Sequence, residues 1–232
     1  MCQTSLNCDL RASPPPLATF GGPATAPPGS TELGIGVGGY GEGLAACPID
    51  IVGATNWFVR WRRGVTGKTD LGFDVQVFDA SNGTFGATPK IAARYEALKG
   101  TRLEGGIGMS DAGNGRSVNA DLAAVMGTYK HPENTWNYYA SVRLAGSHGC
   151  VNLLCLPASA APGSRAPGAL IPLGVVGATA RASDTTRFVM ECGLGIWESR
   201  QYPSRDLYMH LAFGVQFVVG KTSPKAPHGG TS

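Results

Sequence analysis

The sequence predicts an all-β fold, an antiparallel up-and-down transmembrane β-barrel of about ten strands. Three observations support it: apolar residues recur at every second position, the alternating segments run for 9 to 13 residues, and longer and shorter connections follow one another. Alternation places successive side chains on opposite faces of a strand. Typical globular strands have about 5 to 6 residues, whereas a tilted strand needs about 9 to 11 to cross a bilayer.

Residues 1–30 are rich in proline and glycine and predict an extended N-terminal arm. Such segments fix an extended backbone and offer little surface to bury. The start at Cys2-Gln3-Thr4-Ser5, with a long flexible stretch after it, resembles the beginning of a mature bacterial lipoprotein. Cys2 is therefore a candidate for lipidation, and an unmodified or disulfide-bonded cysteine is the alternative.

Residues 31–220 carry the alternation and predict the barrel, and residues 221–232 predict a flexible C-terminal tail. The last segment is the clearest, because seven apolar residues from Leu207 to Val219 share one face while His210 and Gln216 lie on the other. The expected strands are 31–40, 55–65, 69–79, 89–98, 101–110, 117–128, 135–145, 170–181, 187–197 and 207–219.

The connections give a second signal. Those after the even-numbered segments are short, while the others are generally longer and comprise residues 41–54, 80–88, 111–116, 146–169 and 198–206. Bacterial outer-membrane barrels alternate short periplasmic turns with longer extracellular loops. Both chain termini of the predicted barrel would then lie on the periplasmic side.

Aromatic residues gather near the ends of the segments, as expected at the two interfaces of a bilayer. One predicted girdle is periplasmic and the other is at the outer rim. The periplasmic set is Tyr129, Trp136, Tyr138, Phe188 and Phe217, and the outer set is Tyr40, Trp57 and Trp197.

Across residues 31–220 the sequence resembles the general class of small bacterial outer-membrane β-barrel proteins, through its alternation, its connection lengths and its Phe217-Val218-Val219 segment. That segment resembles the signal read by the barrel-insertion machinery, although this chain continues to Ser232. The resemblance implies a location in the bacterial outer membrane and contact with its lipid.

The charge and hydropathy of the chain argue against nucleic acid as a partner and against a membrane-spanning helix. Charged residues make up 15% of the chain, against about 25% in soluble domains. The net charge of +3 is too small and dispersed to indicate nucleic acid as a partner. No segment approaches the roughly 20 apolar residues of a membrane-spanning helix.

The face opposite the apolar rows brings charged residues into the predicted lumen, six cations and five anions in all. Unpaired charges there would be costly, so the near balance predicts an ion-paired plug. The expected polar network of the lumen is Arg60, Arg62, Asp74, Arg94, Glu96, Arg102, Glu104, Asp121, Arg143 and Glu191, with Lys90 as the sixth cation.

Catalytic, cofactor and metal sites are not predicted. Asp206 and His210 resemble part of the site of ten-stranded barrel proteases, which combines acidic residues with a histidine at the outer rim, but no matching second acidic pair follows. Together His148, Cys150 and Cys155 provide three metal ligands without a fourth. A disulfide between Cys150 and Cys155 is the preferred interpretation, with two unpaired cysteines as the alternative.

The run from Gly34 to Gly39 contains the skeleton of a nucleotide-binding fingerprint, but no helix or βαβ unit follows it. We therefore expect a glycine-rich strand, in which missing side chains permit curvature or the close approach of a neighbour.

The leading functional hypothesis is a non-enzymatic outer-membrane barrel with a plugged lumen, acting as a structural or partner-binding subunit. Its connections and N-terminal arm would contact other outer-membrane or periplasmic proteins. Two alternatives stay open at this point: a small pore or transporter, and a soluble ligand-binding β-barrel whose apolar rows line a cavity.

Overall fold

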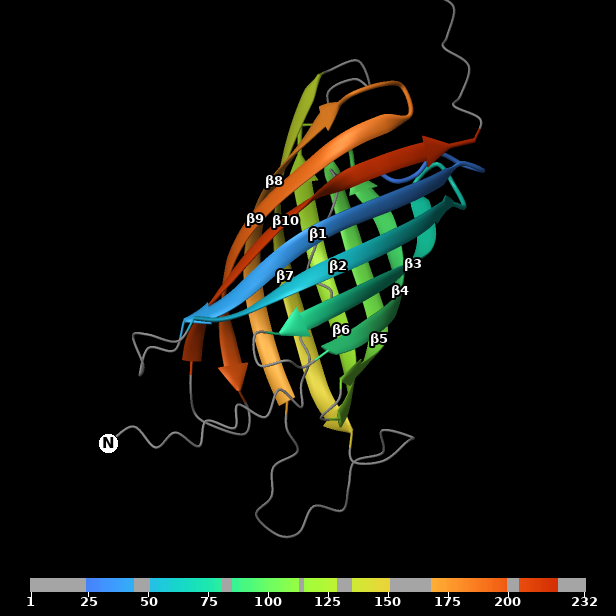
Figure 1. Ribbon diagram of the computed structural model, residues 1–232. Coiled ribbons are helices and arrows are strands. Elements are labelled where there is room, and N and C mark those ends of the chain that lie inside the picture. The colour runs from blue at the N-terminus through green and yellow to red at the C-terminus, as the bar shows by residue number, and fades with distance from the viewer. Residues whose placement is uncertain are drawn as a thin grey trace, which may run out of the picture.

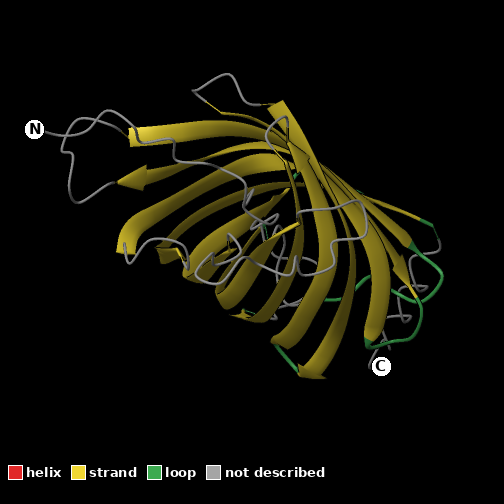
Figure 2. Ribbon diagram, turned by 90° about the horizontal axis from the view of Figure 1, so that it is seen from below, coloured by secondary structure: helices red, strands yellow, loops and turns green. Residues whose placement is uncertain are grey.

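The computed structural model describes residues 24–43, 51–80, 85–112, 115–128, 135–150, 168–199 and 205–220. Regular structure in these ranges is entirely β (Figure 1, Figure 2). Among the same residues no helix has the length and apolar character needed to cross a bilayer. Residues 1–23, the tail 221–232 and the predicted lipidation site Cys2 lie outside the described residues.

The described chain contains the ten strands expected from the alternation. They are β1 (Thr31–Gly43), β2 (Ile51–Gly64), β3 (Thr69–Ala80), β4 (Phe85–Leu98), β5 (Thr101–Ala112), β6 (Gly115–Gly127), β7 (Trp136–Cys150), β8 (Gly168–Arg181), β9 (Thr186–Ser199) and β10 (Arg205–Val219).

Each strand pairs antiparallel with its neighbours in sequence, and β1 pairs with β10 to close the barrel. Thr31 lies opposite Val219 and Gly43 lies opposite Leu207, so the closing ladder follows the full length of β1. Closure satisfies the backbone groups of both edges, which a sheet exposed to lipid requires. The first strand begins and the last strand ends at the same rim of the barrel, and this rim also carries the short turns. Outer-membrane barrels have their short turns in the periplasm, so we call this end periplasmic.

The strands end as predicted on the periplasmic side and extend further than predicted on the outer side. Periplasmic ends agree within one residue, whereas β4 begins at Phe85 and β7 continues to Cys150. The expected connection 111–116 contracts to residues 113–114, and 146–169 contracts to 151–167. Outside the hydrocarbon layer a strand keeps its hydrogen bonds but no longer needs apolar alternation, so the sequence pattern ends early.

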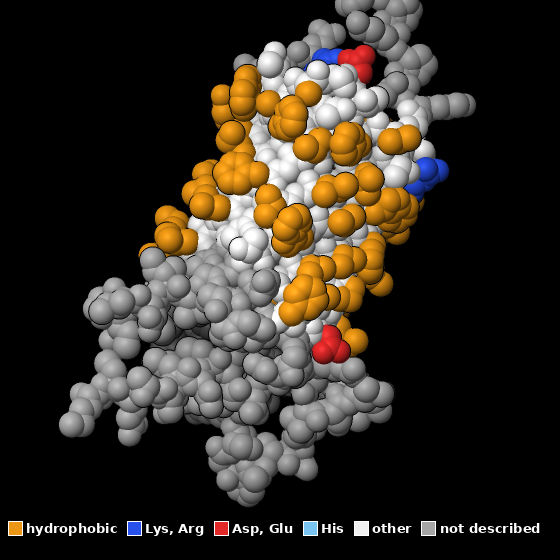
Figure 3. Space-filling model, viewed as in Figure 1, with side chains coloured by type: hydrophobic (Ala, Val, Ile, Leu, Met, Phe, Trp, Pro, Cys, Tyr) orange, Lys and Arg blue, Asp and Glu red, His pale blue; other side chains and the backbone are white. Residues whose placement is uncertain are grey.

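Side chains alternate between the lumen and the outer surface. On β2, Trp57, Val59 and Trp61 are exposed, whereas Arg60 and Arg62 are at most 3% exposed. Figure 3 shows the outer wall covered with apolar side chains and almost free of charge in this view. The distribution is the inverse of a soluble protein, where apolar groups are buried and charges face water.

Glycines allow lumen side chains to approach the wall. A Cβ atom on Gly36 would lie 2.3 Å from Cζ of Phe58, and one on Gly177 would lie 2.3 Å from Cζ of Tyr139. At Gly36 this is the close approach expected for the glycine-rich first strand. Phe58 and Tyr139 belong to a buried cluster with Val125, Val189 and Ala212.

Candidate functional site in the barrel lumen

Asp74 is the centre of the first part of the lumen network. Its Oδ1 lies 3.1 Å from Nε of Arg60, and its Oδ2 accepts a hydrogen bond of 2.8 Å from Arg62. Lys90 places its Nζ 3.5 Å from the same Oδ2. Strands β2, β3 and β4 thus bring three cations to one carboxylate, and each neighbouring group reduces the cost of burying the others.

The network continues across the lumen through strands that are not neighbours. Lys90 on β4 donates to Oδ1 of Asp121 on β6 at 3.0 Å, and Asp121 also accepts from Arg143 on β7. Arg143 donates to Glu104 on β5 at 3.1 Å. Arg60 reaches the same Glu104 oxygen from β2, at 3.8 Å. Ion pairs between non-adjacent strands show that side chains fill this level of the lumen.

A second group lies nearer the periplasmic end. Arg94 on β4 donates to Asp70 on β3 at 2.7 Å and contacts both carboxylate oxygens of Glu32 on β1, at 3.3 and 3.4 Å. Arg102 on β5 joins this group to the first, because it donates to Glu104 at 3.0 Å. Arg94 thereby connects β1 with β4 across the mouth of the barrel.

Residues 24–30 of the N-terminal arm enter the periplasmic mouth. The backbone N–H of Ala26 donates to Oδ2 of Asp70 at 2.8 Å, and the carbonyl of Ala24 accepts from Arg102 at 3.4 Å. Ala26 and Ser30 are buried. The backbone of this segment therefore occupies space that a conducting pore would leave to water.

The buried charges of the lumen balance. Six cations face six anions, and every one is at most 7% exposed: Arg60, Arg62, Lys90, Arg94, Arg102 and Arg143 with Glu32, Asp70, Asp74, Glu104, Asp121 and Glu191. The formal charges of these twelve residues therefore sum to zero.

Glu96 is the predicted lumen residue that stands apart from this set. It is half-buried, at the periplasmic end of β4 where the register with β5 shifts between Glu96 and Leu98. Glu32 and Asp70 occupy the anionic positions that sequence reasoning missed. The alternation did place both on the lumen face, because each is next to an apolar residue of the outer face, Leu33 or Leu71.

Glu191 lies in a separate branch on the wall formed by β7, β9 and β10. Tyr139 donates its hydroxyl to Oε2 of Glu191 at 2.7 Å, and Nε2 of His210 is 3.6 Å from Oε1. His210 is 2% exposed, so it faces the lumen rather than an open cleft at the rim. The side chain of Asp206 lies outside the described residues.

Neutral polar residues line the lumen on the outer side of the ion pairs. Thr88 and Ser110 share a hydrogen bond of 2.6 Å, and Asn119 donates to Ser110. The hydroxyls of Ser117 and Ser147 have no hydrogen-bond partner within the described part of the chain. Buried polar groups of this kind bind water when the space permits it.

The cysteines and histidine proposed from sequence as disulfide or metal residues are only partly described. Cys155 and the side chain of Cys150 lie outside the described residues, so their pairing stays a prediction. His148 is exposed on β7. In the described ranges no three residues of the His, Cys, Asp or Glu types converge as metal ligands, and Cys192 is an exposed free thiol.

The outer surface supplies the environment that this lumen requires. Ile91, Leu122 and Val142 are 62 to 70% exposed. Exposed charged residues such as Arg63 and Asp111 lie next to strand ends. The predicted periplasmic girdle is exposed at Trp136, Tyr138, Phe188 and Phe217, and Trp57 is exposed in the outer set, whereas Tyr129 and the side chains of Tyr40 and Trp197 lie outside the described residues.

An apolar belt around a charged interior fits a bilayer and not water. The soluble-barrel alternative required the apolar rows to line a cavity, and the structure places them on the outside. A closed barrel of tilted antiparallel strands with a polar interior is the form in which β structure crosses the bacterial outer membrane. The protein is an outer-membrane β-barrel.

Comparisons with known proteins find solved structures that are remote in sequence. No family model and no curated protein matches the sequence. OprG from Pseudomonas aeruginosa is similar at 10% identity and a TM-score of 0.38, over 85% of this chain and 99% of that one. The translocator domain of the autotransporter NalP from Neisseria meningitidis is similar at 11% identity and a TM-score of 0.45, over 82% and 88%.

LpxR from Salmonella typhimurium is similar at 10% identity and a TM-score of 0.40, over 80% of this chain and 99% of that one. The membrane assignment rests on the belt and the lumen of this chain itself, which together define a closed, small outer-membrane β-barrel.

Proposed function

We propose that this protein is a non-conducting, non-enzymatic anchor of the outer membrane that presents its connections and N-terminal arm to partner proteins. One observation carries the first half of the proposal: eleven of the twelve buried charges form ion pairs with one another across the lumen, and residues 24–30 enter its periplasmic mouth.

Conduction would require this network to open. A permeating ion needs a continuous hydrated path, whereas here ion pairs connect β4 with β6, β5 with β7, and β1 with β4. Removing one member of a buried pair leaves the other charge uncompensated, at a cost of about 3 to 5 kcal/mol. Several such pairs would have to separate together, so spontaneous opening is rare.

The pairing of the buried carboxylates also argues against acid–base catalysis in the lumen. A catalytic acid or base must reach a substrate. The buried carboxylates instead accept hydrogen bonds from neighbouring Arg, Lys and Tyr side chains, as Glu191 does from Tyr139. This pairing favours a stabilising role for the lumen.

Partner binding is the second half of the proposal. A rigid barrel fixes the positions of its connections, and connections on a rigid scaffold commonly carry recognition. The longest one, residues 151–167, joins β7 and β8 at the outer end, and the arm leads into β1 at the opposite end. The partners we expect are outer-membrane lipid and other outer-membrane or periplasmic subunits.

A small pore is the second candidate function, favoured by the unpartnered hydroxyls of Ser117 and Ser147 on the outer side of the ion pairs. Planar-bilayer recording distinguishes the two. We expect the purified protein to give no single-channel steps, and a reproducible step in the intact chain would overturn the non-conducting assignment.

The partner-binding half has its own test. Chemical crosslinking in native membranes, followed by purification in mild detergent, should recover a specific protein partner. A barrel that stays monomeric and co-purifies with no other protein would contradict this half and leave the conductance result unaffected.

A further inference from the structure

The described end of the N-terminal arm leads from the periplasmic rim into the lumen. Residues 27–29 are exposed, whereas Ala26 is buried. Further toward the N-terminus, the carbonyl of Ala24 accepts a hydrogen bond of 3.4 Å from Arg102. Arg102 is fully buried and also donates to Glu104, a member of the ion-pair network. The chain therefore heads inward at the point where its described part begins.

On the outer side of the ion pairs, large lumen side chains lie over glycines of the neighbouring strand. A Cβ atom on Gly86 would lie 2.3 Å from Cζ of Phe78, its cross-strand partner. One on Gly195 would lie 3.1 Å from Cδ1 of Leu173. Side chains alone just fill a barrel of about eight strands, and the interior widens with strand number. Side chains that lie along the wall of a ten-stranded barrel leave space near its axis.

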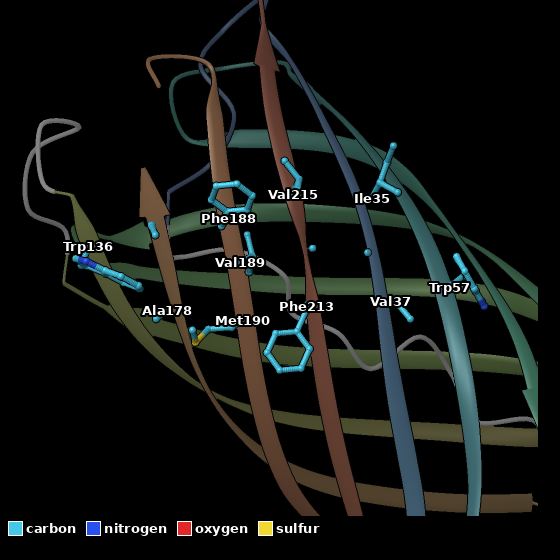
Figure 4. A pocket seen from close by; sticks show the side chains of 13 residues that line it. Ile35, Val37, Trp57, Trp136, Ala178, Phe188, Val189, Met190, Phe213 and Val215 are labelled. Carbon is cyan, nitrogen blue, oxygen red and sulfur yellow. The ribbon is translucent and has the colours of Figure 1, made fainter. Parts of the chain in front are cut away.

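The large apolar side chains of β9 and β10 are on the other side of the wall. Phe188 and Phe213 line a groove on the lipid-facing surface (Figure 4). The lumen face of the same strands carries small residues, among them Gly193 and Ala212. These two strands therefore contribute little bulk to the lumen beyond the ion pairs.

Short lumen side chains in this region are nevertheless buried. Ala145 and Ile171 are cross-strand partners and are both 0% exposed, and Ser117 is 1% exposed. Alanine and serine side chains are too short to meet across a barrel of ten strands, so the facing walls do not cover them. Their burial indicates that another part of the chain lies along the lumen.

We infer that the N-terminal arm runs through the lumen from the periplasmic mouth to the outer end, so that residues 1–11 emerge at the cell surface. This inference goes beyond the proposed function, because it gives the arm a route and a side of the membrane. A partner of residues 1–11 would then meet them outside the cell.

The composition of the arm suits this route. Residues 12–30 contain no charged residue, whereas Asp9 and Arg11 come directly before them. The buried charges of the lumen already balance, and a further charge there would lack a partner. The three prolines at 14–16 have no backbone N–H, so they bring fewer donors that need an acceptor inside the barrel.

The length of the uncharged segment also matches the barrel. An extended proline-rich chain spans about 3.1 Å per residue, so the segment from Ala24 back to Ala12 covers about 35 to 40 Å. The 13 residues of β1, at about 3.3 Å each and a tilt of about 40°, rise by about 30 to 35 Å along the axis. The first charged residue, Arg11, would thus lie at the outer end.

An outer connection is the competing occupant of the lumen. Residues 44–50 and 151–167 join strands at that end and could enter it from outside. The arm is favoured because Arg102 already binds its backbone inside the mouth.

The side of the membrane on which the arm ends can be measured in intact cells. In a full-length variant whose cysteines other than Cys8 are changed to serine, we expect Cys8 to react with a polyethylene glycol maleimide too large to pass through porins. The control carries Ser223→Cys as its sole cysteine, in the tail that follows β10 at the periplasmic end. It should react only after the outer membrane is permeabilised. A heat-modifiable gel shift shows that both variants are folded.

Passage through the lumen has a separate test. Leu17→Asp would put an unpaired charge inside the barrel and should lower the urea midpoint of unfolding in lipid vesicles. Leu6→Asp makes the same change in the part of the arm that lies outside, and its midpoint should equal that of the wild type.

Two results would overturn the inference. One is a Cys8 that reacts only after permeabilisation or only after unfolding, which would assign the lumen to an outer connection. The other is an equal midpoint in Leu17→Asp and Leu6→Asp. Neither test records conductance or recovers a partner, so failure here is distinguishable from failure of the proposed function.

Discussion

Arg60 on β2 and Asp74 on β3 are direct cross-strand partners, and their side chains also form an ion pair, with Nε 3.1 Å from Oδ1. The register of the sheet therefore sets the first contact of the lumen network. Arg62, two residues along β2, reaches the same carboxylate. Each further pair extends this local contact toward the opposite wall.

Asp74→Ala should destabilise the barrel strongly, because it leaves Arg60, Arg62 and Lys90 without their shared carboxylate. We expect a loss of about 3 to 5 kcal/mol in the free energy of unfolding, measured by urea titration in lipid vesicles. Glu96→Gln is the control and should change this value by less than about 0.5 kcal/mol. Similar losses in the two variants would contradict the described network.

Gly177→Ala should destabilise the barrel by about 1 to 3 kcal/mol, because the new methyl group would overlap the Tyr139 ring. In a Tyr139→Ala background the same substitution should cost little, which a double-mutant cycle measures. Gly174→Ala on the same strand is the control, since its Cβ would meet only the Leu194 carbonyl oxygen at 3.8 Å. Additive effects at 139 and 177 would show that the two residues do not touch.

Leu122→Arg should cost about 2 to 4 kcal/mol in vesicles, because it puts a charge on the lipid-facing side near the middle of β6. Leu98→Arg, at the periplasmic end of β4, should cost about 0 to 1 kcal/mol. Urea titration compares them directly. Equal effects at the two depths would contradict the position of the apolar belt.

Cys192 should react according to the solubility of the reagent. In a variant whose other five cysteines are changed to serine, the Cys192 thiol lies on the lipid-facing side between Met190 and Leu194. We expect slow labelling by a sulfonated maleimide and faster labelling by an apolar maleimide in vesicles, read by intact mass. Solubilisation in denaturant is the control and should make both reagents react. Rapid labelling of the folded protein by the sulfonated reagent would place Cys192 in water.

The sequence was sufficient to predict the fold because the alternation is a local property. Each apolar row marks one face of one strand, and the faces of Leu71 and Asp74 follow from counting along β3. The number of strands and their periplasmic ends needed nothing more. The outer ends of the strands could be located only from their hydrogen bonds to neighbouring strands. For this reason β7 was predicted to end at residue 145, whereas it continues to Cys150.

The lumen network was predicted less completely, because alternation along a strand shows which face of the wall a side chain is on but not how far along the barrel axis it lies. Arg94 and Glu96 share a parity, yet Arg94 is buried among carboxylates and Glu96 lies at a shifted register. Glu32 became a partner of Arg94 through the curvature of the barrel, which brings β1 to β4. The contact of Ala26 with Asp70 could not be predicted from the pattern of side chains, because Ala26 donates its backbone N–H.

The β1–β10 ladder also constrains how the molecule is made. Its partners, from Thr31 with Val219 to Gly43 with Leu207, are separated by most of the chain, and such distant pairings form slowly. Until β10 pairs with β1 the cylinder stays open, with two unpaired edges that other chains could join. We therefore expect a chain truncated before β10 to depend on chaperones and to aggregate without them.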